Sequence, residues 1–145
     1  MPPRKIASTK LAKSKQSNAN YVFLQNRLDT FKRFKFDSDH SATCTSEKLA
    51  KAGFISTASP SSPTTAKCAF CCKELEFDPT DDPWEEHVKR GKDCIFVQFG
   101  QIDESDYTIE QFLQLNVADN INKGYDDLIE LARETTKKAK KAVVV

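Results

Sequence analysis

Apolar residues recur at intervals of three and four between residues 21 and 31, and this spacing predicts one face of a helix. They are Tyr21, Leu24, Leu28 and Phe31, with Arg27 beside them. A second helix is expected to follow Thr45, whose hydroxyl can cap it, to run through Lys51 and to stop at Gly53.

Short extended segments follow the second helix. Phe54-Ile55 begins a strand, and Thr57–Thr65, rich in serine and with two prolines, is predicted to be a loop. Lys67–Phe70 and Glu74–Phe77 are interpreted as the two arms of a β-hairpin. The order of elements predicts an α+β domain.

A long helical pattern begins at Thr108, where Thr108-Ile-Glu-Gln111 forms a capping box. No proline interrupts it up to Lys141, although Asn116, Asn120, Asn122 and Gly124 weaken its middle. Such a helix would be roughly 50 Å long at about 1.5 Å per residue. That length exceeds a small domain, so we expect partner helices to cover much of its apolar face; the alternative is a helix folded back on the domain. The expected interface residues are Ile109, Phe112, Leu113, Val117, Ile121, Leu128 and Leu131.

The charges are segregated along the 145 residues, although the net charge is only +1. Residues 1–20 are basic and poor in large apolar side chains, which indicates a disordered arm, either a solvating tail or a contact for nucleic acid. We expect a zinc domain over 21–99, a linker over 100–107, a helix over 108–141 and a tail over 142–145. No apolar run approaches the length of a membrane span.

The main candidate chemistry is a group of metal ligands, Cys68, Cys71, His87 and Cys94. Thiolate and imidazole groups at this spacing are typical of a tetrahedral zinc site, and four protein ligands leave no open position for catalysis. We therefore expect one structural Zn²⁺. His87 is predicted to lie on a short helix that Asp82 caps, Pro83 begins and Gly91 ends.

The other cysteines and the second histidine receive different interpretations. Cys72 competes with Cys71 as the second ligand, but the C-x-x-C spacing favours Cys71 and leaves Cys72 as a small buried residue. Cys44 is expected in the core and His40 in a surface loop. The chain has five cysteines, four of them close to one expected zinc site, and this suits a reducing compartment, either the nucleus or the cytoplasm.

No enzyme motif accompanies the zinc ligands. A zinc deaminase needs H-x-E followed by P-C-x-x-C, and here the order is reversed and the glutamate and proline are missing. The chain also lacks G-x-S-x-G, a Walker loop and H-E-x-x-H. The sequence therefore predicts a protein that is not an enzyme.

Together these motifs resemble a baculovirus IAP repeat (BIR) domain. The matching residues are Arg27, Phe34, Cys44, Gly53-Phe54, Cys68-x-x-Cys71, the run Asp82-Pro83-Trp84-Glu85-Glu86-His87, and Cys94. A single such domain followed by a long helix that opens with T-I-E-Q-F-L-Q-L is similar to the survivin-like, single-BIR members of the family. The resemblance implies a three-stranded antiparallel sheet with short helices around a Cys-Cys-His-Cys zinc.

Survivin-like proteins are not enzymes but subunits of the chromosomal passenger complex, which brings Aurora B kinase to centromeres and the spindle midzone. Their groove binds the N-terminus of a core histone phosphorylated on its third residue, threonine, and their long helix bundles with INCENP and borealin. The resemblance assigns the histone amine and first side chain to Leu75, Glu76, Phe77, Asp81 and Glu86, and the phosphate to Lys73 and Arg90. It also implies a possible homodimer through the start of the long helix, including Ile109 and Phe112.

Three departures from the family pattern fall in or near the groove. Arg90 stands where these proteins carry a histidine, and an arginine binds phosphate bidentately and stays charged at every relevant pH. The segment before His87 is one residue shorter, so that Phe77 stands in place of a pocket tryptophan, and Phe34 replaces another tryptophan.

Three alternatives to this interpretation remain open. The acidic residues near the groove, read without the resemblance, are a solvated face. A second function class is a caspase inhibitor, which usually needs flanking segments unlike the basic arm. A third is an adaptor for other peptides with an N-terminal alanine.

Overall fold

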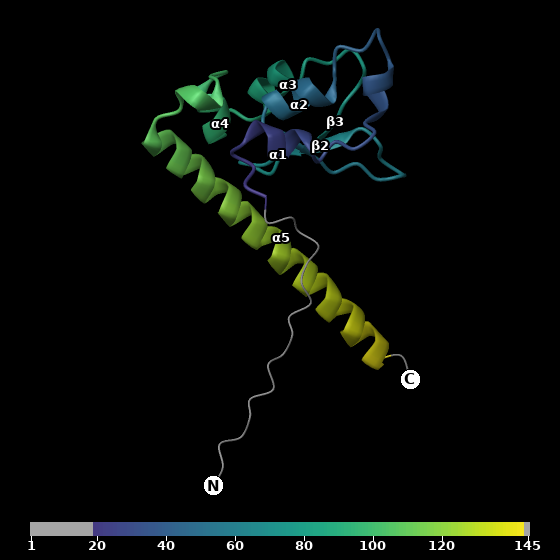
Figure 1. The fold of residues 1–145 in the computed structure, drawn as a ribbon. Coiled ribbons are helices and arrows are strands. Elements are labelled where there is room, and N and C mark those ends of the chain that lie inside the picture. The colour runs from purple at the N-terminus through teal and green to yellow at the C-terminus, as the bar shows by residue number, and fades with distance from the viewer. Residues whose placement is uncertain (1–18, 144–145) are drawn as a thin grey trace.

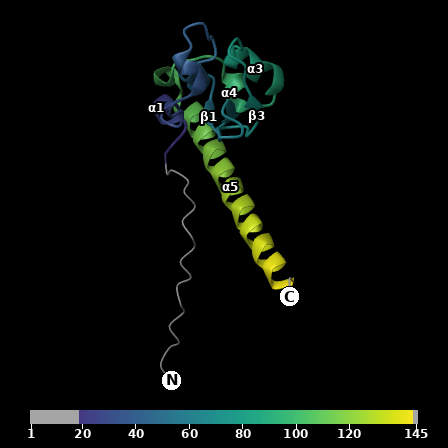
Figure 2. The same cartoon turned by 90° about the vertical axis from the view of Figure 1, so that its right-hand side faces the viewer.

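The computed structural model of the chain describes residues 19–143. Short helices surround a small sheet, and one long helix extends far beyond this domain in both views (Figures 1 and 2). The elements are α1 (Leu24–Leu28), η1 (Lys35–Ser38), α2 (Ser46–Lys51), β1 (Phe54–Ser56), β2 (Thr65–Cys68), β3 (Glu74–Glu76), α3 (Pro83–Arg90), α4 (Ile95–Phe99), η2 (Glu104–Asp106) and α5 (Ile109–Val143). The predictions for the basic arm, up to residue 18, and for residues 144–145 lie outside the described residues.

The sheet has the antiparallel order β1-β2-β3, with Phe54 opposite Cys68 and Lys67 opposite Glu74. The predicted hairpin is confirmed, but its first arm ends at Cys68 instead of continuing to Phe70. The chain leaves the ladder there to form the turn that carries Cys71. The three-stranded sheet therefore ends at the start of the metal-binding turn.

Local capping signals set the ends of the helices. The Thr45 hydroxyl accepts a hydrogen bond from the Lys48 backbone at 3.3 Å, and the Asp82 carboxylate accepts from Trp84 and Glu85 at 3.0 and 3.1 Å. Gly53 ends the α2 segment with φ of 94°, and a Cβ there would meet the Phe96 ring at 2.9 Å. Helix α1 covers only Leu24–Leu28 of the predicted 21–31, since the Thr30 hydroxyl bonds the Arg27 carbonyl at 2.7 Å and closes a turn.

Arg27 lies inside the domain and ties several segments together. Its side chain is only 4% exposed, and it donates to the carbonyls of Ala50 (2.8 Å), Tyr21 (2.7 Å) and Val22 (2.9 Å). Its guanidinium also lies over the rings of Phe70 and Phe96. Burial lowers the pKa of this group from its ordinary value. These bonds join the N-terminal segment to α2 and place the guanidinium against the zinc-binding half of the domain.

Helix α5 is continuous for 35 residues, about 52 Å, through the polar segment Asn116–Gly124. The predicted capping box is present: the Gln111 N–H donates to the Thr108 hydroxyl at 3.1 Å, and the Thr108 N–H donates to the Gln111 side chain at 3.0 Å. The predicted linker holds η2, where Glu104 accepts a hydrogen bond from the Leu24 backbone at 2.7 Å. None of the helices within residues 19–143 is long and apolar enough to cross a membrane.

One face of α5 packs against the domain. For this face, the alternative of a helix folded back on the domain is the correct one. Leu115 is fully buried, and Asp119 accepts hydrogen bonds from the Tyr21 backbone and the Lys123 ammonium at 3.1 and 2.8 Å. Further along, the Asn122 side chain donates to the Ala69 carbonyl at 2.7 Å, in the turn between Cys68 and Cys71. A salt bridge of 2.7 Å between Lys67 and Asp126 follows. The first half of α5 is therefore docked, although its opposite face stays exposed.

Candidate functional site

The four predicted metal ligands come together between the sheet and two helices. Cys68 ends β2, Cys71 lies in the following turn, His87 lies on α3, and Cys94 is the N-cap of α4. Their ligand atoms all lie within 4.8 Å of one another. The Cys68 and Cys94 sulfurs are 3.8 Å apart, and the Cys71 sulfur is 3.7 Å from His87 Nε2. A tetrahedron with Zn–S bonds of about 2.3 Å separates two sulfurs by about 3.8 Å, so the cluster fits zinc.

The orientation of the His87 ring suits a metal ligand. Its Nδ1 lies 2.7 Å from the carbonyl oxygen of Ala52, which can only accept a hydrogen bond. Nδ1 therefore carries the proton, and the lone pair of Nε2 faces the cysteine sulfurs. The ring is 1% exposed and packs against Phe54 at 4.8 Å. The residue that caps the C-terminus of α2 thus supplies the hydrogen-bond partner that orients His87.

The cluster stabilises a thiolate, the form of cysteine that binds metals. Hydrogen bonds from Cys68 and Cys71, together with backbone N–H groups of Phe96 and Val97, lower the pKa of Cys94 to about 3. Burial raises the pKa of the Cys68 thiol well above its ordinary value. The hydrogen bonds within the cluster therefore favour a thiolate at the start of α4.

The remaining cysteines separate clearly from the cluster. Cys44 is fully buried, as predicted, and burial raises its pKa to about 12. The prediction that Cys72 is buried is wrong: its side chain is exposed, and its backbone has φ of 62°. The tight turn after Cys71 points this residue outward, and Cys72 does not belong to the four-residue group.

Comparison with known proteins agrees with this geometry. The family model described as BIR, inhibitor of apoptosis domain, matches residues 27–98. The Caenorhabditis elegans chromosomal passenger complex protein bir-1 is 48% identical over 104 residues, which cover 72% of this chain and 64% of that protein. Baculoviral IAP repeat-containing protein 5.1 of Xenopus tropicalis is 40% identical over 111 residues, 76% of this chain and 67% of that protein. The chain belongs to the BIR family.

The BIR assignment settles the fold and the cofactor. The three-stranded antiparallel sheet, the short helices and the following long helix are those of the predicted BIR architecture. BIR domains bind structural zinc, and Cys68, Cys71, His87 and Cys94 are the residues that would hold it here. Zinc would supply four bonds that tie β2, α3 and α4 together. The chain spans 64% of the length of bir-1 and 41% of that of bir-2, a second C. elegans relative.

The predicted peptide-binding residues of this BIR protein lie on β3 and around α3. Leu75 is half-buried and Glu76 is exposed on β3, whereas Asp81 and Glu86 are half-buried. The Asp81 carboxylate accepts the Asp78 backbone N–H at 2.7 Å, which orders the turn before α3. Phe77 differs from its predicted role, because it is only 2% exposed and its ring packs edge-on against Phe54 at 5.2 Å. The core takes up this ring and leaves little of it for a ligand.

The two predicted phosphate-binding residues lie together although they are far apart in sequence. The Lys73 ammonium donates to the backbone carbonyl of Arg90, so the hairpin turn meets the C-terminal end of α3. Arg90 and Lys89 form ion pairs with Glu86 at 3.4 and 3.2 Å, and the hydrogen bond from Lys89 is the main cause that lowers the pKa of Glu86. The Arg90 guanidinium is 59% exposed, so it can reach an incoming anion.

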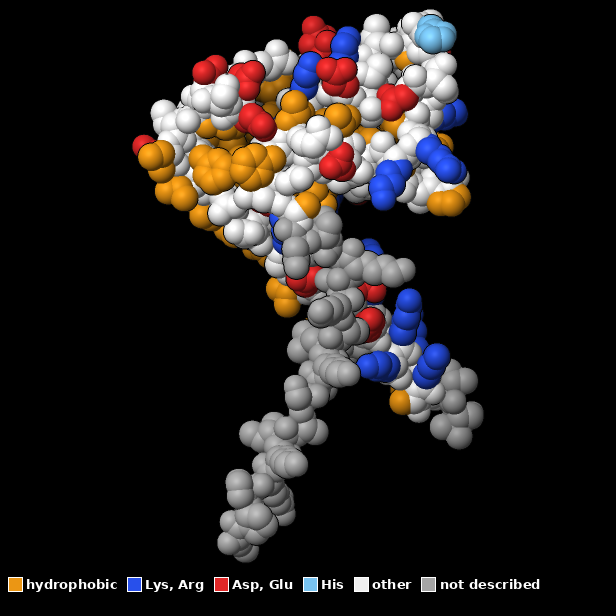
Figure 3. Space-filling model, viewed as in Figure 1, with side chains coloured by type: hydrophobic (Ala, Val, Ile, Leu, Met, Phe, Trp, Pro, Cys, Tyr) orange, Lys and Arg blue, Asp and Glu red, His pale blue; other side chains and the backbone are white. Residues whose placement is uncertain are grey.

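The predicted partner face of α5 is largely exposed. Exposed fractions run from 52% for Ile121 to 81% for Ile109, with the remainder between them: Leu113, Val117, Leu128 and Leu131. Together with Ile95, the first half of this face lines an open groove of about 840 Å³. Hydrophobic side chains also line the edge of the molecule where α5 begins (Figure 3). Phe112 is the exception, since it packs against Phe23 at 5.7 Å.

Several supporting residues were not predicted from the sequence. Helix α4, which presents Cys94, has five residues and is too short to show a helical period. The docking residues Leu115, Asp119 and Asn122 were also not identified: Leu115 and Asp119 were given no role, and Asn122 was interpreted only as a residue that weakens the helix. Their spacing of three to four along α5 is the signal that could have found them.

Proposed function

We propose that this BIR protein is a subunit of a chromosomal passenger complex that reads a phosphorylated histone tail. Its surface would bind the free N-terminus of a core histone phosphorylated on the third residue, and α5 would join the helices of partner subunits. The similarity to bir-1, 48% over 72% of this chain, supports the assignment. The closed four-ligand metal site supports a binding role rather than an enzymatic one.

The acidic side of the surface suits a protonated amine. Glu76 on β3, Asp81 before α3 and Glu86 on α3 supply three carboxylates, and Leu75 on β3 supplies a half-buried apolar side chain. A protonated N-terminus forms charge-assisted hydrogen bonds with carboxylates, and a small first side chain such as alanine needs an apolar contact beside them. We assign the amine chiefly to Glu76 and Asp81, because Glu86 already holds two cations.

The observation that carries the proposal is the contact between Lys73 and Arg90. The Lys73 side chain reaches the backbone of Arg90 at the end of α3, and the Arg90 guanidinium pairs with Glu86, so two cationic residues and a carboxylate belong to one connected group. A phosphate two residues from a protonated amine needs this combination of charges. A solvated acidic face, the simpler interpretation, gives no role to the contact between Lys73 and the Arg90 backbone.

The exposed face of α5 suits helices of the INCENP and borealin type. Helices bundle by burying apolar stripes against one another, and the exposed residues follow one stripe over most of α5. Through these subunits the protein would place Aurora B kinase at centromeres and later at the spindle midzone. A homodimer through Ile109 and its neighbours would use the same face and compete with the partner helices.

The proposal is tested with peptides that begin Ala-Arg-Thr-Lys and carry phosphate on the threonine. Glu76→Gln removes a carboxylate charge and Arg90→Ala removes a cation, and we expect each to weaken binding at least tenfold, the equivalent of about 1.4 kcal/mol. Glu47→Gln, an exposed glutamate on α2 outside this surface, is the matched control. Equal affinity of all three variants and the wild type would contradict the assigned surface.

The role of α5 needs a separate measurement. Leu113→Glu and Val117→Glu place charges on exposed positions, so the free protein should stay folded. Both should abolish co-purification with co-expressed borealin-type and INCENP-type helices and leave phosphopeptide binding unchanged. Retained assembly in both variants would refute the proposed partner face.

A further inference from the structure

A second pocket lies away from the zinc ligands and the peptide surface. It has a volume of about 200 Å³, and two segments line it, residues 31–35 and the loop between β1 and β2. Phe31 and Phe34, packed edge to face at 5.6 Å, contribute to its lining. None of the residues proposed above for zinc, histone or partner binding belongs to it.

The charge of this pocket is entirely positive. Its three charged lining residues are Lys32, Arg33 and Lys35, and no acidic residue lines it. All three side chains are exposed, and none forms an ion pair with any residue from 19 to 143. Lys51, Lys67 and Lys89, by contrast, each pair with a carboxylate. The pocket therefore offers unneutralised cations to an anion.

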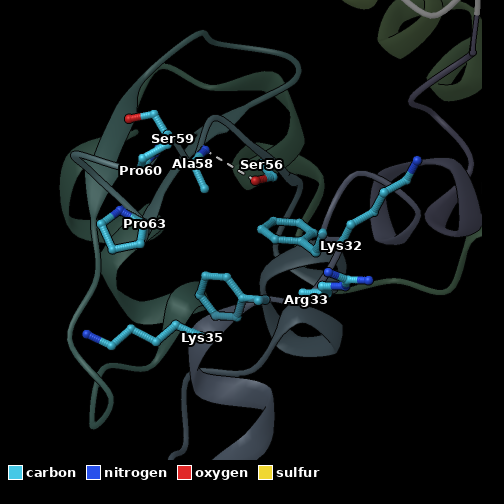
Figure 4. A pocket seen from close by; sticks show the side chains of 10 residues that line it. Lys32, Arg33, Lys35, Ser56, Ala58, Ser59, Pro60 and Pro63 are labelled. Carbon is cyan, nitrogen blue, oxygen red and sulfur yellow. Dashed lines mark hydrogen bonds between the residues drawn. The ribbon is translucent and has the colours of Figure 1, made fainter.

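The backbone at this pocket is strained. Arg33 has φ of 53°, in the left-handed region that side-chain-bearing residues rarely adopt. Backbone strain of this kind is often found at binding sites. Figure 4 shows Lys35 below Pro63 and Lys32 with Arg33 on the other side of the pocket. The cations therefore flank the pocket on two sides.

The opposite wall carries a serine followed by proline. Ser59 lines the pocket, its side chain is exposed, and Pro60 follows it. Ser59 and Ser62 form a tight turn with backbone hydrogen bonds of 3.1 and 3.0 Å. The only other hydroxyl in the lining is that of Ser56, which accepts the Ala58 N–H. Ser59 is thus the lining hydroxyl that is both exposed and placed before a proline.

We propose that Ser59 is phosphorylated by a proline-directed protein kinase and that the cations of this pocket bind the phosphate. The Ser59 Oγ attacks the γ-phosphorus of a nucleoside triphosphate, the new Oγ–P bond forms, and the bond to the nucleoside diphosphate breaks. The hydroxyl proton passes to a base of the kinase. A phosphate of charge about −1.5 to −2 then neutralises cations that have no carboxylate partner.

Figure 4 shows Lys35 and Ser59 on the same side of the pocket, with Pro63 between them, and we assign the phosphate chiefly to Lys35 on this basis. Lys32 and Arg33 add positive potential from the far side, and the exposed arginine can turn to bind two phosphate oxygens. The phosphate would tie the loop between β1 and β2 to residues 32–35. Modification would thereby add a charged contact between this loop and residues 32–35.

The modification is tested on the zinc-loaded full chain with a proline-directed kinase, ATP and mass spectrometry. We expect one phosphate on the wild type, none on Ser59→Ala or Pro60→Ala, and an unchanged level on Ser62→Ala. Ser62 is the matched control, since it also precedes a proline but does not line the pocket. Unchanged phosphorylation of Ser59→Ala would overturn the assignment.

Phosphate binding is tested on protein with phosphoserine incorporated at position 59, by following its ³¹P resonance with pH. Nearby cations favour the dianionic form of the phosphate. The second pKa of the phosphoserine, ordinarily about 6, should therefore be lower by roughly half a unit in the protein than in a phosphorylated peptide of residues 56–64. Lys35→Glu should reverse this shift, whereas Lys48→Glu, an exposed control on α2, should not. A pKa equal to that of the peptide and insensitive to Lys35→Glu would refute the phosphate site.

Discussion

Because α5 is docked on the zinc domain, truncation of two leucines that are two positions apart should change the stability of the protein by different amounts. Leu115 is fully buried against the domain, whereas Leu113 is 54% exposed on the opposite face. Truncating a fully buried leucine to alanine costs about 2–5 kcal/mol, from lost transfer free energy and the cavity left behind. Full burial of a leucine is worth about 1.5–3 kcal/mol, so truncating Leu113 should cost about 1 kcal/mol or less in the free protein.

These values predict a difference of at least about 1 kcal/mol between Leu115→Ala and Leu113→Ala. The assay is urea denaturation at fixed excess zinc, because bound metal adds to the apparent stability. Hydrogen exchange supplies a second readout: Leu115→Ala should speed exchange of amides in the first half of α5, and Leu113→Ala should not. Equal destabilisation by the two variants, with equal exchange, would mean that α5 is not docked as described.

Three further predictions concern the metal, the buried arginine and the phosphate site. Cys68→Ser should lose bound zinc and unfold, since a structural zinc site contributes roughly 10–16 kcal/mol of apparent binding free energy. Cys72→Ser should keep one zinc ion per chain by metal analysis, and zinc loss in this variant would revise the ligand set. Arg27→Met removes the guanidinium hydrogen bonds to the carbonyls of Ala50, Tyr21 and Val22 and should cost about 3 kcal/mol or more in urea denaturation. The exposed Arg133→Met should change stability little, and similar values for the two variants would argue against the buried role. In Arg90→His, the phosphopeptide affinity relative to the wild type should fall as pH rises from about 6 to 8, because histidine loses its charge in this range and arginine does not. A ratio of the two affinities that stays constant with pH would show that Arg90 does not contact the phosphate.

Features with local signals were predictable from the sequence. The spacing of Cys68, Cys71, His87 and Cys94 identified the ligand group, and Asp82 and Thr108 marked two helix starts through short-range capping bonds. Each depends on residues close together in the chain or on a rigid donor set. The structure reproduces them within a residue or two.

Features set by tertiary contacts were not predictable from the sequence. Asp119 and Asn122 look like solvated positions in a helix, yet they bond the Tyr21 backbone and the Ala69 carbonyl across long sequence separations. Phe77 reads as a pocket residue, but in the shortened segment its ring fills the core beside Phe54. Cys72 follows the metal-binding turn in a left-handed conformation that composition does not reveal. Packing decided each of these outcomes.

The central claim is that one surface reads a free N-terminal amine and a phosphate together. The most direct measurement is calorimetric titration of four peptides starting Ala-Arg-Thr-Lys, with the amine free or acetylated and the threonine phosphorylated or not. We predict tight binding only for the free, phosphorylated peptide, with at least a tenfold loss when either feature is removed, about 1.4 kcal/mol each. Equal affinity with and without phosphate would leave a reader of N-terminal alanine alone, and no binding by the folded, zinc-loaded protein would contradict the claim outright.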